Sequence, residues 1–229
     1  MNDEGRTRYR ALVAPWTATV ASVQRLDGRA SRVVLERIDG YEPTLGDTVA
    51  VDVGGGQMRR YTVADATGSG LQFVGVLTGL GPATPWLESL VPGSTVAGRG
   101  PERPVLSPDG ARGVVVFGDA TAIGTALSVV RSVGVHVRVI IRSAVPMPDT
   151  TALLLESGCT SVSVVSATAV HEGDLAVVVD EWGSDGVGVV VVGEQAANHA
   201  VRTAAIALGI SRERVATRTF WRPDRVGLE

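Results

Sequence analysis

The hydrophobic pattern changes about half-way along the chain, and this change constrains the fold more than any other feature. Before residue 105, short apolar segments recur about every ten residues between turn signals such as Asp27-Gly28, which is typical of a β-sandwich or a closed barrel. One short helix is expected at Pro85–Leu90, with Thr84 as its N-cap. The expected strands are Ala18–Gln24, Arg32–Ile38, Thr48–Val53, Arg60–Ala64, Leu71–Leu77 and Thr95–Gly98.

After residue 112 the apolar segments become continuous instead of alternating. Such runs are apolar on both faces, as a parallel sheet buried between helices requires. Strand and helix patterns then alternate, which predicts a doubly wound α/β domain. The expected strands are Gly113–Phe117, Val135–Ile141, Ser161–Val165, Leu175–Val179 and Val187–Val192, and the expected helices are Ala122–Ser132, Thr150–Ser157 and Ala196–Leu208.

The segment Glu102–Arg112 separates the two patterns. It carries two prolines and a glycine, so it is the best candidate for a linker. We therefore predict an all-β barrel domain followed by an α/β domain with a parallel sheet. Residues 1–106 would form the barrel domain, and residues 112–229 would form the α/β domain.

Composition excludes several classes of function. The net charge of -3 argues against nucleic acid or an anionic membrane as the main partner. All 21 basic residues are arginine, which excludes Schiff-base catalysis by lysine. The single cysteine, Cys159, excludes an internal disulfide and a cysteine-based metal cluster, and the three histidines lack ligand spacing, so no metal site is expected.

The N-terminus is polar and no apolar run approaches ~20 residues, so we expect a cytoplasmic protein. Its oligomeric state is left open.

The first stretch with chemical meaning is Arg59-Arg60-Tyr61-Thr62, on an expected barrel strand. A guanidinium can bind a pyrophosphate in bidentate fashion. Tyr61, two residues beyond Arg59, lies on the same face of the strand and could stack on a flat ring. The hydroxyl or N–H of Thr62 could reach a ring nitrogen. The plainer alternative is a barrel strand with an exposed arginine and a half-buried tyrosine.

The second stretch, Gly79–Trp86, reads Gly-Leu-Gly-Pro-Ala-Thr-Pro-Trp. Its glycines allow close approach of the backbone to a ligand, and the helix that follows presents unpaired N–H groups to a phosphate. The candidate binding residues here are Gly81, Ala83, Thr84 and Trp86. A capped helix after a turn would explain the same residues.

The third feature is the end of the chain. The segment Val191–Glu194 closes the last long apolar strand, and Glu194 would lie where open α/β sheets bind ligands. A carboxylate that stabilises a helix N-terminus is an equally good interpretation of Glu194. The chain then runs through Thr219–Arg222, where Trp221 and Arg222 are candidates for binding a substrate.

Taken in order, these stretches resemble the siderophore-interacting protein family, the FAD-dependent ferric-siderophore reductases of the ferredoxin reductase superfamily. The segment Arg59–Thr62 is similar to the flavin motif Arg-x-Tyr-Ser/Thr, and Gly79–Trp86 is similar to Gly-Pro-Ala-Ser-x-Trp. The Gly193-Glu194 turn and the aromatic-Trp-Arg tail resemble the end of family members. The resemblance spans roughly residues 18–222.

The resemblance implies a ferredoxin reductase-like two-domain architecture, in which residues 1–106 form a Greek-key, flavin-binding-like barrel and residues 112–229 form a nucleotide-binding-like domain. It also implies an FAD-dependent oxidoreductase with NAD(P)H as the candidate donor. Its small-molecule substrate would be a ferric siderophore. Thr62 and Glu194 would be catalytic, and Arg222 and Trp221 would bind the substrate. The implied cofactor-binding residues are Arg59, Tyr61, Thr62, Gly81, Ala83, Thr84 and Trp86.

The chain departs from the family pattern mainly in the second half. Ala120 and Gly124 stand where an acidic residue and a proline are expected, and Thr78 stands where a histidine often lies. These departures motivate a second hypothesis, a redox-neutral cyclase or cycloaddition enzyme of natural-product biosynthesis. It would bind a polyketide-like molecule in an apolar cleft lined by Trp86 and Trp221. A binding module without catalytic activity is a third hypothesis.

Overall fold

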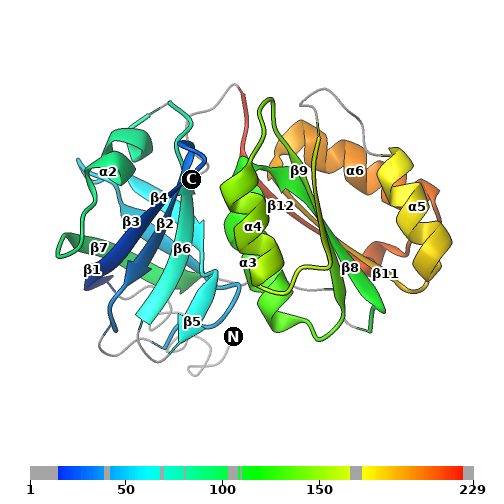
Figure 1. Ribbon diagram of the computed structural model, residues 1–229, viewed down its shortest axis with the longest axis horizontal. Helices are drawn as coiled ribbons and strands as arrows, with labels where there is room; N and C mark the ends of the chain where they lie inside the picture. The colour runs from blue at the N-terminus through cyan, green and yellow to red at the C-terminus, as the bar shows by residue number, and fades with distance from the viewer. Residues whose placement is uncertain are drawn as a thin grey trace, which may run out of the picture. The chain divides into compact units, whose positions relative to one another are not determined.

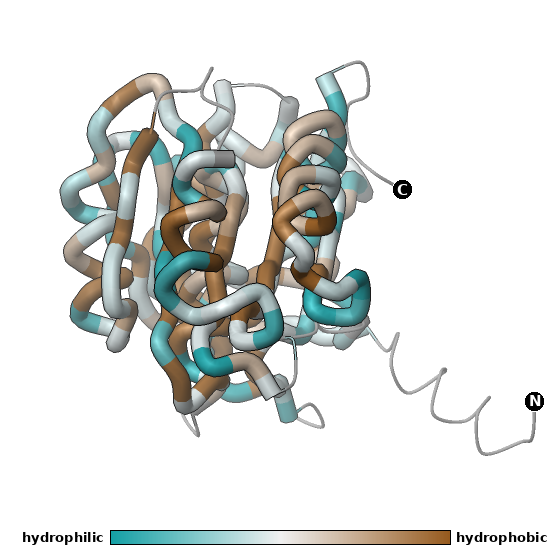
Figure 2. Tube along the Cα trace, turned by 90° about the vertical axis from the view of Figure 1, so that its right-hand side faces the viewer, coloured by the Kyte–Doolittle hydropathy of each residue, from teal (hydrophilic) through white to brown (hydrophobic). Residues whose placement is uncertain are grey.

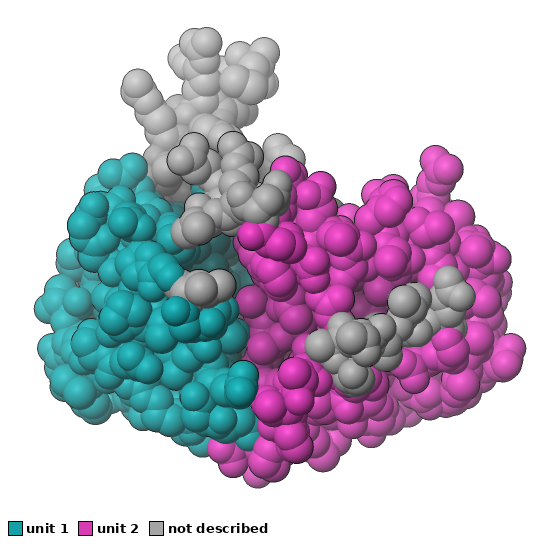
Figure 3. Space-filling model, turned by 90° about the horizontal axis from the view of Figure 1, so that it is seen from above, with its two compact units in different colours: residues 1–104 teal, residues 105–229 magenta. Residues whose placement is uncertain are grey.

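A computed structural model describes residues 15–38, 42–67, 70–79, 81–102, 108, 110–165 and 172–223. The chain divides into two compact units, residues 1–104 and 105–229 (Figure 3). Part of the expected linker Glu102–Arg112 lies outside the described residues.

Unit 1 is a seven-stranded antiparallel sheet with the order β4-β3-β7-β1-β2-β6-β5. The long strand β1 pairs with β7 through its first residues and with β2 through its last, and its register shifts between Val20 and Ser22. A bulge of this kind bends a strand. The elements are β1 (Pro15–Leu26), β2 (Ala30–Leu35), β3 (Thr48–Asp52), β4 (Met58–Thr62), β5 (Asp65–Thr67), β6 (Gly70–Val76), α2 (Ala83–Ser89) and β7 (Thr95–Glu102).

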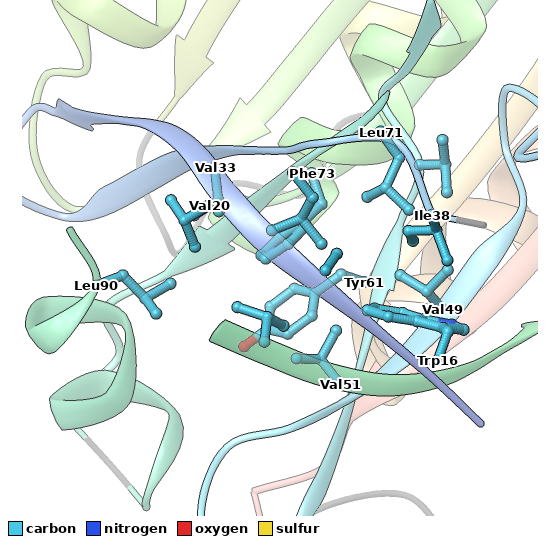
Figure 4. Close-up of a cluster of buried hydrophobic side chains, with 14 of the residues drawn as sticks. Trp16, Val20, Val33, Ile38, Val49, Val51, Tyr61, Leu71, Phe73 and Leu90 are labelled. Atoms are coloured by element: carbon cyan, nitrogen blue, oxygen red, sulfur yellow. The ribbon is translucent and has the colours of Figure 1, made fainter. Parts of the chain in front are cut away.

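The sheet of unit 1 closes on itself around one hydrophobic core. Strand β4 lies at one edge of the strand order and β6 lies near the other edge. Even so, the rings of Tyr61 on β4 and Phe73 on β6 stack with their centroids 4.6 Å apart. Figure 4 shows both rings among the buried valines and leucines of the neighbouring strands. The predicted barrel is therefore confirmed.

Unit 2 is a five-stranded parallel sheet with the order β10-β9-β8-β11-β12. The strand order reverses between β8 and β11, which is the switch point where open α/β sheets bind ligands. The strands are β8 (Gly113–Asp119), β9 (His136–Arg142), β10 (Ser161–Val165), β11 (Val187–Glu194) and β12 (Val215–Trp221). The helices are α3 (Ile123–Ser132), α4 (Pro148–Glu156), α5 (Glu172–Trp182) and α6 (Gln195–Ala207), with the short 3-10 turns η1 (Ala120–Ala122) and η2 (Arg212–Arg214).

Helices cover both faces of this sheet, with α3 and α4 on one side and α5 and α6 on the other (Figure 1). The central strands β8 and β11 are buried over nearly their whole length. In Figure 2 the hydrophobic stretches follow the strands and the hydrophilic residues gather at the turns. The alternation of apolar strands with helices thus predicts the α/β layers correctly.

The segment Leu175–Val179, predicted as a strand, is helical in α5, so that prediction is wrong. Leu175 and Val178 are buried whereas Val177 is 59% exposed. This spacing of three between buried positions is helical, and the run of valines concealed it. The predicted strands also omitted β5 and β12.

The short helix α2 begins earlier than predicted. Pro82 is its N-cap, so Thr84, predicted to be the cap, lies inside the first turn. Pro85 is tolerated there because the first N–H groups of a helix have no partner within the helix. In the part of the chain that the structure describes, no helix is long and apolar enough to cross a membrane.

Candidate functional site

The first motif lies on β4, and its side chains alternate between the two faces of the strand. Tyr61 pairs with Val49 and Arg59 pairs with Val51, both of which are core residues. Arg59 and Tyr61 therefore share the inward face, as predicted from their spacing. Thr62 belongs to the opposite face and is 6% exposed.

Three nearly parallel aromatic rings connect β4 to α2. Tyr61 and Phe73 stack at 4.6 Å, and Trp86 of α2 lies 6.3 Å from Tyr61 and 6.5 Å from Phe73. Phe73 is fully buried, whereas Trp86 is half-buried at the edge of the core. This aromatic cluster brings the Arg59–Thr62 and Gly79–Trp86 motifs together within unit 1.

Tyr61 is less accessible than the sequence suggested. Only 9% of the residue is exposed, so its ring packs mainly against the core of its own unit. Burial raises the pKa of the Tyr61 phenol well above its ordinary value, and the nearby Arg59 guanidinium opposes that shift. The phenol is therefore neutral at physiological pH. A contact between this ring and a cofactor stays a prediction, and Trp86 is the more exposed ring of the cluster.

The turn before α2 exposes backbone. Gly79 and Gly81 have φ angles of +72° and +71°, which glycine adopts without strain. A Cβ added at Gly79 would meet nothing within 4 Å. The N–H of Gly79 donates to the Oγ1 of Thr84 at 3.1 Å, which closes the turn. No side chain caps the N-terminus of α2, and its first turn, where Ala83 and Thr84 lie, holds no acidic residue.

In unit 2 the candidate residues gather at the carboxyl ends of the strands. Glu194 is the last residue of β11, as predicted, and it forms an ion pair with Arg142, the last residue of β9. Both side chains are largely buried, with 18% of Glu194 and 22% of Arg142 exposed. The pair spans the end of β8, which lies between β9 and β11.

Asp119, at the end of β8, is the centre of this group, and it was not among the predicted site residues. One oxygen, Oδ1, accepts from the N–H of Thr121 at 2.8 Å and from the Thr121 hydroxyl. The other, Oδ2, accepts from the N–H of Glu194 at 3.1 Å and from the indole N–H of Trp221 at 2.8 Å. One local sequence signal could have identified Asp119, because an aspartate two residues before a threonine is typical of an N-cap, and Asp119 caps the turn η1. Its bond to Trp221, which is distant in sequence, left no signal.

Trp221 and Arg222 lie at the end of the described chain. Trp221 is half-buried and its N–H is occupied by Asp119. The Nε atom of Arg222 is buried and has no hydrogen-bond partner among the described residues. A buried guanidinium N–H without an acceptor is costly, so a ligand oxygen there would be favoured. Within the described ranges, no group of three His, Cys, Asp or Glu side chains could hold a metal ion.

Comparison with known proteins identifies the fold. A siderophore-interacting protein from Acinetobacter baumannii matches 93% of this chain and 92% of its own, with a TM-score of 0.73 and 20% identity. A siderophore-interacting protein, SipS, from Aeromonas hydrophila matches 92% of this chain and 99% of its own, with a TM-score of 0.72 and 18% identity. The ferredoxin reductase of carbazole 1,9a-dioxygenase matches 91% of this chain and 68% of its own, with a TM-score of 0.75 and 17% identity.

The chain has the ferredoxin reductase fold. The predicted two-domain architecture is thereby confirmed. No protein-family model and no curated protein matches the sequence. The likeness is therefore one of fold, and it extends over nearly the full length of the siderophore-interacting proteins.

Proposed function

We propose that the protein is an FAD-dependent oxidoreductase of the siderophore-interacting type, with NAD(P)H as the electron donor. The observation that carries this proposal is the aromatic cluster of Tyr61, Phe73 and Trp86. It connects Tyr61 of the β4 motif to Trp86, the last residue of the Gly79–Trp86 stretch, with the two ring centroids 6.3 Å apart. This contact supports a single binding site made by both motifs. The fold of unit 1 and unit 2 supports the same conclusion.

The residues of unit 1 fit the two chemically different parts of FAD. Arg59 carries a half-buried guanidinium, whose Nη1 also donates to the carbonyl of Met58 at 2.8 Å. That charge, with the open backbone at Gly79 and Gly81, suits a pyrophosphate. Trp86 offers a half-buried aromatic face to a flat ring. When bound, FAD would accept electrons in pairs from a dinucleotide donor and release them singly.

Each residue of the first motif has a distinct proposed task. Arg59 binds the pyrophosphate, and Thr62 donates or accepts a hydrogen bond at the flavin ring. Tyr61 keeps the strand in place by packing against Phe73, so that Arg59 and Thr62 keep their positions. Gly81, Ala83 and Thr84, which belong to the turn and first residues of α2, offer the backbone that approaches the phosphates, and Trp86 bounds the ring.

In unit 2 the proposed tasks concern the substrate, an anionic ferric chelate whose Fe(III) leaves as Fe(II) after gaining one electron. Arg222 supplies positive charge and a buried N–H that lacks an acceptor among the described residues. Trp221 offers an apolar face. Glu194 is held by Arg142 through Oε2, so Oε1 is the atom proposed to accept a hydrogen bond or a proton. The comparisons give no support to the cyclase hypothesis.

Visible spectroscopy tests the proposal directly. The purified chain is incubated with FAD, freed of excess cofactor by gel filtration, and titrated with NADPH or NADH without oxygen. We expect a yellow protein with about one FAD per chain, whose absorbance is bleached by a dinucleotide and restored by a ferric catecholate. A colourless protein after reconstitution would contradict the proposal. A yellow protein that neither dinucleotide bleaches would contradict only the assigned donor.

A further inference from the structure

The ends of three strands in unit 2 are connected by one carboxylate. Asp119 closes β8, Glu194 closes β11 and Trp221 closes β12. The Oδ2 atom of Asp119 accepts from the main chain of Glu194 and the indole of Trp221, while Oδ1 accepts both donors of Thr121. Charge-assisted bonds of this kind are stronger than neutral ones. The network therefore fixes where the final strand ends.

The backbone around the carboxylate is shaped to receive it. Gly193 has a φ angle of +124°, and a Cβ there would lie 2.6 Å from the Oδ2 atom of Asp119. The pairing of β11 with β12 also shifts between Gly193 and Glu194, so that Glu194 lies opposite Trp221. Bulges re-aim side chains near functional sites. The irregularity at Gly193 thus leaves room for the carboxylate of Asp119 and places Glu194 opposite Trp221.

Among the described residues, the charged groups around the network differ in how they are satisfied. Glu194 is neutralised by Arg142, and the carboxylate of Asp119 already accepts four hydrogen bonds. Arg222 follows directly after Trp221 and has a buried Nε without a partner among the described residues. Because Trp221 is fixed by Asp119, the backbone that carries Arg222 is fixed as well.

We propose that Asp119 is a positioning residue of the ligand site in unit 2. Through its bond to Trp221 it holds the end of β12 in the position that presents Trp221 and Arg222 to an anionic ligand. The identity of that ligand as a ferric chelate rests on the proposed function, whereas the positioning role of Asp119 does not.

Two variants change the same hydrogen bond from opposite sides. Asp119→Asn keeps the shape of the side chain but removes its charge and replaces one acceptor oxygen by an NH2 group, and Trp221→Phe keeps an aromatic ring but removes the N–H donor. In the NMR spectrum of the ¹⁵N-labelled full chain, Trp221→Phe assigns the indole signal. We expect Asp119→Asn to speed hydrogen exchange at that indole by about tenfold or more, because the charge-assisted bond is replaced by a weaker neutral one at most. An unchanged exchange rate would overturn the proposed bond.

Ligand binding is measured with a redox-inert probe, the gallium(III) complex of 2,3-dihydroxybenzoate, which has the charge of its ferric counterpart. We expect Asp119→Asn, Trp221→Phe and Arg222→Gln each to weaken binding about tenfold. The double variant of Asp119 and Trp221 should bind no more weakly than the weaker-binding single variant, because both substitutions act on the same bond. Asp185→Asn, in an exposed ion pair with Arg112, is the control and should bind like the wild type.

The outcomes separate the positioning role from the proposed function. Additive losses in the double variant, or wild-type affinity in Asp119→Asn, would overturn the role of Asp119. If the wild type binds the gallium complex and these variants lose affinity, but FAD does not bind, the role of Asp119 stands and the proposed function fails. If the wild type does not bind the complex, the assignment of an anionic ligand to Arg222 is overturned.

Discussion

The two units present their candidate residues by different physical means. In unit 1 the motifs of β4 and α2 are brought together by hydrophobic packing of aromatic rings. In unit 2 the candidate residues are brought together by charged hydrogen bonds around Asp119. Packing depends on volume, whereas a hydrogen-bond network depends on each donor and acceptor. Replacing a single donor or acceptor atom should therefore weaken the site of unit 2, whereas changing the volume of a side chain should weaken the site of unit 1.

The largest effect is expected for Phe73→Ala. Phe73 is fully buried and packs against both Tyr61 and Trp86, and removal of a buried phenylalanine ring costs about 3–5 kcal/mol. Urea denaturation followed by circular dichroism measures the loss. Val177→Ala, at an exposed position of α5, is the control and should leave the curve nearly unchanged. A loss below about 1 kcal/mol would show that the aromatic cluster does not organise unit 1.

Gly193→Ala should have the next largest effect, and it tests the network of unit 2. The added Cβ collides with the carboxylate of Asp119 and forces a strained φ angle, so we expect a loss of roughly 2–4 kcal/mol. Gly54→Ala is the matched control, because Gly54 also has a positive φ angle, +104°, but a Cβ there meets nothing within 4 Å. Differential scanning calorimetry compares the two variants. Equal melting temperatures would contradict the crowding of Asp119 by Gly193.

The smallest effect concerns pH, at a buried carboxyl group of unit 1. Burial raises the pKa of Asp47 above its ordinary value of 3.8, and the N–H of Thr44, which donates to it at 2.9 Å, opposes the shift. A raised pKa in the folded state means that Asp47 contributes stability at low pH and loses it as pH rises. Asp47→Asn keeps an acceptor for Thr44 and lacks this titration. The difference in melting temperature between the variant and the wild type should therefore shift in favour of the variant as pH rises above 3.8.

A difference between the two melting temperatures that stays constant from acidic to neutral pH would contradict this account of Asp47. The comparison is internal, because wild type and variant are measured in the same buffers.

The sequence predicted features that depend on neighbouring residues and missed those that depend on distant ones. The spacing of Arg59 and Tyr61 correctly placed both on one face of a strand, and a continuous apolar run correctly placed Glu194 at the end of β11. The role of Asp119 depends on Trp221, which is 102 residues further along the chain. No local pattern encodes such a contact.

Two other differences also have a physical cause. The burial of Tyr61 follows from the closure of the sheet, because its ring meets Phe73 of a strand that is remote in the strand order. The helix α5 was mistaken for a strand because valine is common in buried strands. Its single exposed valine, Val177, is visible only once the neighbours of the helix are known.

Calorimetric titration of FAD into the wild type, Arg59→Ala and Arg112→Ala tests the central claim most directly. Arg112 is an exposed arginine of unit 2, so its loss controls for the removal of one positive charge. We expect one FAD per chain for the wild type and Arg112→Ala, and an affinity about thirtyfold lower for Arg59→Ala, since a charge-assisted bidentate contact contributes about 2 kcal/mol. Equal affinity in all three proteins, or no FAD binding by the wild type, would contradict the account.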